Sequence, residues 1–204
     1  MAKYREIFGQ FGLGVKTEID FFESVGYKGS KKDAGLILDF SIGQYDTYTP
    51  MQLSQYINTI ANGGNRLKPL ILKGYYENDT YIKVEPIVLN KVDIDEKYIE
   101  RVQLGFKMVM DGNGTGYNYI DSKYKPAGKT GTSTSYIDRN LDGVVETATT
   151  TNTFVGYAPY DQPRVAFTVI SPNVKLAYSG GSYKTSVNKK ISYEVAQKFF
   201  EIYK

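Results

Sequence analysis

The residues with the clearest chemical potential lie in the segment KPAGKTGTSTSY, residues 125–136. Lys129 can supply positive potential for a substrate carboxylate, and the hydroxyls of Thr130 and Thr132 can hydrogen-bond to the same group. Gly131 lets a substrate backbone approach closely, because it has no Cβ. A backbone N–H of such a strand can also point at a developing oxyanion. The segment therefore predicts one wall of a site for a carboxylate-bearing substrate.

Composition narrows the chemistry that such a site can perform. The 204 residues include no cysteine and no histidine. Disulfides, thiolate catalysis, Ser-His-Asp triads and nearly all zinc sites are therefore excluded. Acid–base work falls to carboxylates, tyrosine or lysine, and we expect no cofactor.

Charge and hydropathy point to an ordinary globular chain. The net charge is +3, carried by scattered lysines without a basic stripe, so no nucleic-acid partner is expected. The length predicts one domain with a substantial core. The sequence contains no run of 18 or more apolar residues, which is the length needed to span a membrane, so the chain itself is expected to be soluble.

The segment TPMQLSQYINTIANGG, residues 49–64, carries the best-marked helix. Thr49 as N-cap, Pro50 at the first helical position and Gln52 at the third form a capping box. The glycine pair 63–64 supplies a left-handed end.

Apolar spacing and turn residues predict the other elements. Residues 66–93 are expected to form one hairpin with its turn at Asn78–Asp79. The remaining expected elements are the end of a helix (1–10), an extended loop (11–48), a helix (95–110), strands (151–160 and 164–172), a loop (173–188) and a helix (190–203). The inward residues of that last helix are Ile191, Val195, Phe199 and Ile202. This order indicates an α+β domain whose antiparallel sheet is covered by helices.

Four stretches together resemble a known family. They are GQYDTYTPMQLSQYINTIANGGNRLKP, DGNGTG, AGKTGTS and FVGYAPYDQPRVAFTVI. Their order and spacing closely resemble the C-terminal part of a penicillin-binding protein transpeptidase domain of the class B, monofunctional type. The resemblance covers residues 1–204 and implies part of the fold shared by penicillin-binding proteins and serine β-lactamases.

The resemblance implies roles for the K-T-G segment, which matches the family's third motif on the edge strand of the active-site sheet. Lys129, Thr130 and Gly131 are that motif. Thr130 and Thr132 would bind the carboxylate of substrate or β-lactam, and the Thr132 backbone N–H would supply half of the oxyanion hole. The loop Gly114–Gly116 would shape the cleft without taking part in catalysis.

The family's other two motifs, S-x-x-K with the nucleophilic serine and S-x-N, belong upstream of this chain. Matches within the chain fall in the wrong places. Ser186 to Lys189 precedes the last helix, where a serine is expected as an N-cap. Ser122 to Lys125 lies in a loop, and residues 171–173 (SPN) end a strand. We therefore expect no catalytic residue in this chain and no activity from the chain alone.

In this interpretation the chain is part of a serine-type D-Ala-D-Ala transpeptidase. Its partners would be peptidoglycan stem peptides, β-lactam antibiotics and the upstream part of the transpeptidase domain, at the outer face of the cytoplasmic membrane. Two alternatives stay open: a class D β-lactamase or β-lactam sensor, and a non-catalytic envelope module. The absent upstream strands would leave an exposed sheet edge and apolar surface, and hence self-association.

A second motif could bind calcium. In DRNLDG, residues 138–143, Asp138, Asn140 and Asp142 match positions 1, 3 and 5 of a calcium loop, with Gly143 at position 6. Glu146 falls at position 9, but position 12 is Thr149 rather than the bidentate glutamate. A solvated turn rich in Asn, Asp and Gly explains the segment equally well, and we predict no metal.

Overall fold

The computed structural model describes residues 1–29, 37–176 and 186–203. The chain divides into two compact units, Met1–Glu100 and Arg101–Lys204. We call them unit 1 and unit 2, and each is described by itself.

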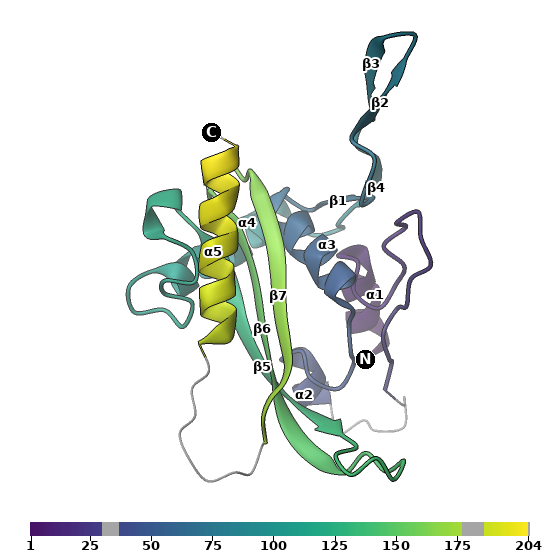
Figure 1. Cartoon of the computed structure of the whole chain (residues 1–204), viewed down its shortest axis with the longest axis vertical. Coiled ribbons are helices and arrows are strands. Elements are labelled where there is room, and N and C mark those ends of the chain that lie inside the picture. Colours follow the sequence, from purple (N-terminus) through teal and green to yellow (C-terminus); the bar gives the residue numbers. More distant parts are fainter. Residues whose placement is uncertain (30–36, 177–185, 204) are drawn as a thin grey trace. The chain divides into compact units, whose positions relative to one another are not determined.

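The described part of unit 1 contains three helices: α1 (Ala2–Gln10), α2 (Ile37–Ser41) and α3 (Pro50–Ala61) (Figure 1). The opening helix is confirmed. The short helix α2 corrects the prediction of an extended loop over residues 11–48. Phe40 of α2 is 1% exposed and stacks on Phe8 of α1, with ring centroids 5.3 Å apart. Five residues are too few to show a helical period, and a tertiary contact stabilises this helix instead.

The capping box of α3 is present as predicted. The Gln52 backbone N–H donates to Thr49 Oγ1 at 3.2 Å, and the Thr49 N–H donates to Gln52 Oε1 at 3.0 Å. Gly63 and Gly64 follow the helix with φ of 63° and 89°, the left-handed conformation that ends a helix at little steric cost to glycine.

The prediction of a single hairpin over residues 66–93 needs correction. The described strands form two separate pairs: β1 (Asn65–Leu67) with β4 (Val88–Lys91), and β2 (Gly74–Glu77) with β3 (Thr80–Lys83). Pro69 and Pro86 lie between the two pairs, and proline has no N–H for a ladder. The predicted turn is confirmed, since Asn78 and Asp79 adopt φ of 47° and 62°.

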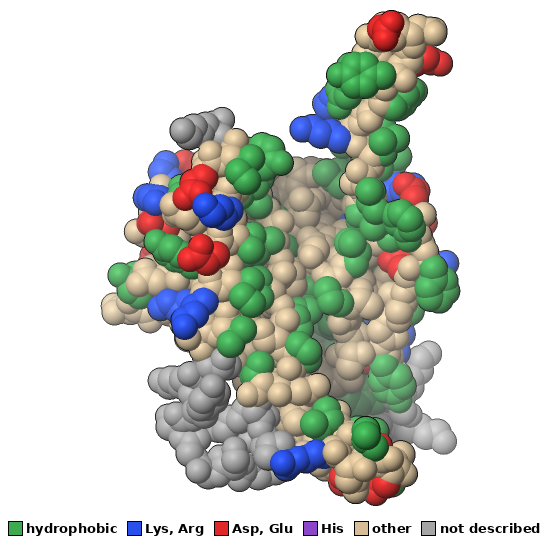
Figure 2. Space-filling model, viewed as in Figure 1, with side chains coloured by type: hydrophobic (Ala, Val, Ile, Leu, Met, Phe, Trp, Pro, Cys, Tyr) green, Lys and Arg blue, Asp and Glu red, His purple; other side chains and the backbone are tan. Residues whose placement is uncertain are grey.

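The β2–β3 pair forms an arm of unit 1 with apolar side chains on its surface. Figure 2 shows hydrophobic side chains along this arm. Tyr76 is 75% exposed and Ile71, close to the arm's base, is 64% exposed.

Unit 2 is built on an antiparallel sheet with the strand order β5-β6-β7. The strands are β5 (Ala127–Ile137), β6 (Thr147–Ala158) and β7 (Val165–Leu176). Helix α5 (Val187–Ile202) lies along one face of this sheet (Figure 1). Helix α4 (Glu96–Met110) begins in the last residues of unit 1 and continues into unit 2, ahead of the sheet in the chain. The α+β prediction is confirmed, although β6 and β7 are longer than predicted and α5 begins three residues earlier.

The face that α5 buries differs from the prediction. Three of the four residues predicted to face inward, Ile191, Val195 and Ile202, are 42%, 42% and 68% exposed, and the fourth, Phe199, is half-buried. The buried positions are instead Asn188, Ser192 and Ala196. These small side chains let the helix approach the strands closely, and Asn188 Nδ2 donates to the backbone oxygens of Asn152 and Val169 on β6 and β7. Helical spacing alone could not identify the buried face, because the predicted residues and the buried residues both recur at three- to four-residue intervals.

The core of unit 2 gathers around Phe154 of β6, which is fully buried. The buried members of this cluster are Met110, Ile120, Phe154, Ala158 and Ala196. The Tyr119 ring stacks on Phe154 with centroids 4.7 Å apart. This cluster ties the end of α4 and the following loop to the sheet that carries the K-T-G segment. No helix in the described ranges has the length and apolar character needed to cross a bilayer.

Candidate functional site

The K-T-G segment lies on β5, at one edge of the described sheet, as predicted. In the antiparallel register Lys129 lies opposite Val155, and Thr130 lies opposite Phe154. Within the described part of the chain β5 pairs with β6 alone. Its second edge therefore has backbone groups available to another extended segment.

The side chains of this segment face solvent to different degrees. Lys129, Gly131 and Thr132 are exposed, while Thr130 is half-buried. The Lys129 ammonium donates to the backbone oxygen of Thr130 at 2.6 Å. This contact folds the amine back along the strand and leaves its remaining two protons for other acceptors.

Two glycines of β5 differ in what they permit. A Cβ on Gly128 would lie 2.8 Å from the Val155 backbone oxygen and 2.9 Å from the Phe154 ring, so core packing requires this glycine. A Cβ on Gly131 would lie 3.6 Å from Thr153 Cβ, which is an ordinary contact. The protein's own packing therefore does not require glycine at 131, and its missing side chain leaves open space beside the exposed strand.

The G-T-G loop lies beside the same strand. Thr115 Oγ1 lies 3.0 Å from Thr130 Oγ1, and either oxygen can be the donor. The predicted role of Gly114–Gly116 in shaping this region remains a prediction, but the contact between the two hydroxyls is a relationship that the sequence did not indicate.

A polar cluster centred on the buried Thr149 supports β5 beyond the K-T-G segment. Thr149 Oγ1 donates to Asn173 Oδ1 at 2.7 Å, and Ser135 Oγ lies 2.7 Å from Thr151 Oγ1. Thr149 is 1% exposed. These bonds join all three strands and stiffen the sheet that presents the site. Their only signal in the sequence is the run of threonines over 147–153.

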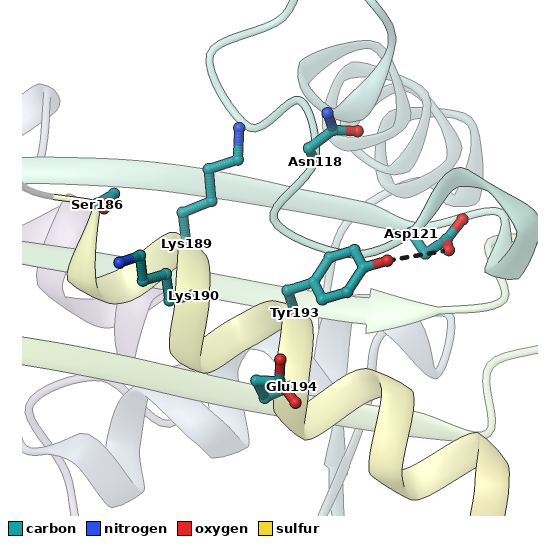
Figure 3. A pocket seen from close by; sticks show the side chains of 7 residues that line it. All are labelled: Asn118, Asp121, Ser186, Lys189, Lys190, Tyr193 and Glu194. Atoms are coloured by element: carbon teal, nitrogen blue, oxygen red, sulfur yellow. Dashed lines mark hydrogen bonds between the residues drawn. The ribbon is translucent and has the colours of Figure 1, made fainter.

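The motif match at Ser186 and Lys189 lies at the start of α5. The Ser186 side chain makes no capping hydrogen bond, although the residue occupies the predicted N-cap position. Figure 3 shows the Lys189 amine directed away from Ser186. The Lys189 amine is therefore not placed to take a proton from the Ser186 hydroxyl.

These two residues line a pocket of about 810 Å³ between α5 and the loop before β5. Asn118, Asp121 and Tyr193 line it as well, and Tyr193 Oη donates to Asp121 Oδ2 at 3.3 Å (Figure 3). The backbone N–H of Lys123, followed by its ammonium, holds the pKa of Asp121 below its ordinary value. This pocket does not include the K-T-G residues.

The other two motif matches also lie outside a catalytic geometry. Ser122 begins a 3₁₀ helix of three residues (Ser122–Tyr124), and Lys125 pairs with Asp161 at 3.0 Å. Ser171 lies within β7 and is 9% exposed. Ser122 does not start an α-helix that also carries Lys125, and the S-x-N match at 171–173 lies inside a strand. The expectation that no residue of this chain is the nucleophile stays a prediction.

The acidic loop after β5 brings three carboxylates together. Oxygens of Asp138, Asp142 and Glu146 lie within 4.8 Å of one another. Asp138 already accepts the backbone N–H groups of Asp142 and Gly143 at 3.2 and 2.8 Å. Thr149, at position 12 of the calcium pattern, lies in β6 with its hydroxyl bonded to Asn173. The loop is thus stabilised by its own hydrogen bonds, and the absence of a metal remains a prediction.

Comparison with known proteins decides the family. The family described as "Penicillin binding protein transpeptidase domain" matches residues 1–193. The chain belongs to the penicillin-binding protein transpeptidase family. Penicillin-binding protein 2A of Bacillus subtilis is 43% identical over 207 aligned positions, which cover 98% of this chain and 28% of that protein. Peptidoglycan D,D-transpeptidase MrdA of Acinetobacter baumannii is 31% identical over 191 positions, covering 80% of this chain and 27% of that protein.

The solved structures of penicillin-binding proteins show the same fold. Penicillin-binding protein 2B of Streptococcus pneumoniae superposes with a TM-score of 0.79 at 32% identity, and the match covers 98% of this chain and 32% of that chain. This chain therefore spans less than a third of the length of each of these three relatives. The family prediction is confirmed.

Proposed function

We propose that this chain forms part of a peptidoglycan D,D-transpeptidase that cross-links stem peptides through an acyl-serine intermediate and binds β-lactams. The observation that carries the proposal is the K-T-G segment on a strand edge that no described strand occupies. An extended stem peptide could align along this edge. The Lys129 ammonium and the hydroxyls of Thr130 and Thr132 would hold its terminal carboxylate.

The reaction would proceed in two acyl transfers. A serine outside this chain would attack the carbonyl carbon of the penultimate D-Ala, and a neighbouring lysine would take its proton. The carbonyl oxygen would become an oxyanion, stabilised in part by the Thr132 N–H. Terminal D-Ala would leave with a proton on its amine. An amine of a second stem peptide would then attack the acyl-serine, form the new amide and release the serine.

The location that fits this chemistry is the outer face of the cytoplasmic membrane, where peptidoglycan is assembled. The membrane anchor would lie in a part of the protein outside this chain. The upstream part of the transpeptidase domain would be its first partner, supplying the S-x-x-K and S-x-N motifs. A hydrolase or sensor would use the same carboxylate-binding strand, so the test must separate these outcomes.

Intact-mass measurement after incubation with a penicillin tests the proposal. We expect no adduct on this chain alone, and a stoichiometric adduct when the sequence encoded directly before it is included in the polypeptide. An adduct on this chain alone would contradict the inference that the nucleophile lies elsewhere. Rapid turnover of the penicillin would identify a β-lactamase, and no adduct on a folded longer polypeptide would overturn the proposal.

A variant in this chain tests the role of the K-T-G strand. Thr130→Val removes the hydroxyl but keeps the shape, and we expect acylation of the longer polypeptide to slow by about ten- to a hundredfold, because a hydrogen bond to a charged group is lost. Thr134→Val, further along β5 and exposed, is the matched control and should leave the rate unchanged.

A further inference from the structure

Thr115 has no assigned role in the proposed reaction, yet its side chain reaches a residue that has one. Its hydroxyl oxygen lies 3.0 Å from that of Thr130. Thr115 is exposed and Thr130 is half-buried, so the contact lies on the surface of the proposed carboxylate site. This inference rests on the proposed function.

The loop that carries Thr115 is held tightly by the end of α4. The Gly114 N–H donates to the Asp111 oxygen at 2.7 Å, and the Gly116 N–H donates to the Val109 oxygen at 2.9 Å. A Cβ on Gly114 would lie 2.1 Å from that same Val109 oxygen. Gly114 and Gly116 therefore let the loop pack closely against the end of α4. This packing fixes the position of Thr115 between them.

A hydroxyl has one proton to donate and two lone pairs to accept. If Thr130 is to donate its proton to a carboxylate, the hydroxyl must point away from the protein and toward the substrate. A donor on the other side, such as the Thr115 hydroxyl, favours that orientation because it occupies a lone pair of Thr130. Hydrogen bonds arranged in such a chain also strengthen one another.

We propose that Thr115 is a positioning residue for Thr130. In the substrate complex Thr115 donates to Thr130 Oγ1, and Thr130 donates to the carboxylate of the stem peptide or β-lactam. Thr115 itself does not touch the carboxylate. The G-T-G loop then has a defined purpose, which is to place one hydroxyl beside the K-T-G strand.

Acylation by a penicillin and by its methyl ester provides the test, on the polypeptide that includes the sequence encoded directly before this chain. The ester lacks the negative charge that Thr130 would bind. We expect Thr115→Val to slow acylation by the acid about three- to tenfold, the equivalent of one hydrogen bond, and to leave acylation by the ester unchanged. Thr115→Ser keeps the hydroxyl and should react like the wild type.

The coupling to Thr130 gives a second readout. In a Thr130→Val background, Thr115→Val should have no further effect on the acid, because the group it orients is gone. Three results would show a general structural role for Thr115 and overturn the inference. Thr115→Val could slow acylation by the acid and by the ester equally, or Thr115→Ser could lose as much acylation rate as Thr115→Val. The third such result is that the effects of Thr115→Val and Thr130→Val on acylation by the acid add in the double variant. If the folded wild type forms no adduct at all, the proposed function fails and this inference with it. If the wild type reacts and Thr115→Val reacts equally fast with the acid, the inference alone fails.

Discussion

Arg5 and Asp46 form a bidentate ion pair that joins α1 to the segment before α3. Arg5 Nε and Nη2 donate to the two carboxylate oxygens of Asp46 at 2.8 and 2.7 Å. The Gly29 N–H donates to the same carboxylate at 2.9 Å. The side chains of Arg5 and Asp46 are 15% and 2% exposed, so the ion pair is largely shielded from solvent.

The ion pair predicts a loss of stability in acid. Burial alone would raise the pKa of Asp46, but the hydrogen bonds from Arg5 and Gly29 outweigh burial and hold that pKa below its ordinary value of 3.8. A depressed carboxyl pKa stabilises the fold above the unfolded-state value, and this stability is lost as the pH falls through the lower folded-state pKa. We expect the urea midpoint of unfolding to be steady near neutral pH and to fall below about pH 4.

Asp46→Asn isolates this contribution. The variant should lose about 3 kcal/mol of unfolding free energy at pH 7, because Arg5 loses its carboxylate partner and keeps only the Gly29 backbone oxygen, at 3.0 Å, as an acceptor. It should also show a shallower loss between pH 5 and pH 2 than the wild type. Asp39→Asn, on the exposed surface of α2, is the control and should reproduce the wild-type curve. An unchanged acid slope in Asp46→Asn would contradict the assignment.

Contacts between residues close in the sequence could be predicted, whereas contacts between residues far apart in the sequence could not. The α3 capping box was found because Thr49 and Gln52 are three residues apart and bond to each other. The buried contacts of Gln55 were missed, because its Nε2 donates to the Thr17 oxygen, 38 residues away, at 3.0 Å. Arg66 likewise donates to Gln55 Oε1 at 2.9 Å, and only the folded chain brings these groups together.

The same distinction holds for the site. The K-T-G strand was predicted because its residues are contiguous, and Lys129 to Thr132 lie on β5 as expected. The contact of Thr115 with Thr130 was missed, because it depends on how the loop lies against α4. The buried face of α5 was assigned wrongly because hydrophobicity favoured Val195, whereas close packing on the sheet selected Ala196.

The G-T-G loop predicts a contrast between two neighbouring glycines. Gly114→Ala places a Cβ 2.1 Å from the Val109 oxygen, and we expect it to cost about 1–3 kcal/mol of unfolding free energy, because backbone must move. Gly112→Ala meets nothing within 4 Å. This matched control should be neutral or slightly stabilising, because alanine reduces the entropy of the unfolded chain. Denaturant unfolding of both variants is the measurement, and equal midpoints would contradict the packing argument.

The corrected face of α5 predicts opposite outcomes at adjacent positions. Ala196 is fully buried, so Ala196→Leu should overpack the sheet contact and cost about 1–3 kcal/mol. Val195 is 42% exposed, so Val195→Ala should change stability by less than about 0.5 kcal/mol. Thermal unfolding distinguishes the two, and a large loss in Val195→Ala with none in Ala196→Leu would restore the face predicted from the sequence.

The acidic loop over residues 138–146 leads us to expect that calcium does not change the stability of the protein. The Asp138 carboxylate already accepts two backbone N–H groups, and position 12 of the calcium pattern is the buried Thr149. We expect the melting temperature to be the same in excess calcium and in a chelator, since a ligand that binds only the folded state would raise it. A rise with calcium that Asp138→Asn and Asp142→Asn abolish would show a metal site and contradict the prediction.

The exposed apolar stripe of α5 predicts self-association of this chain. Ile191, Val195 and Ile202 share one side of the helix and are each more than two-fifths exposed, and large exposed apolar patches drive association. Sedimentation velocity should show a larger average mass as the concentration rises. Ile191→Lys combined with Val195→Lys should reduce this effect, whereas Met108→Lys, at an apolar position on α4 that is 62% exposed, should not. A sharp monomeric boundary at all concentrations, together with high thermal stability, would show that the stripe needs no cover and would remove this argument for a missing upstream partner.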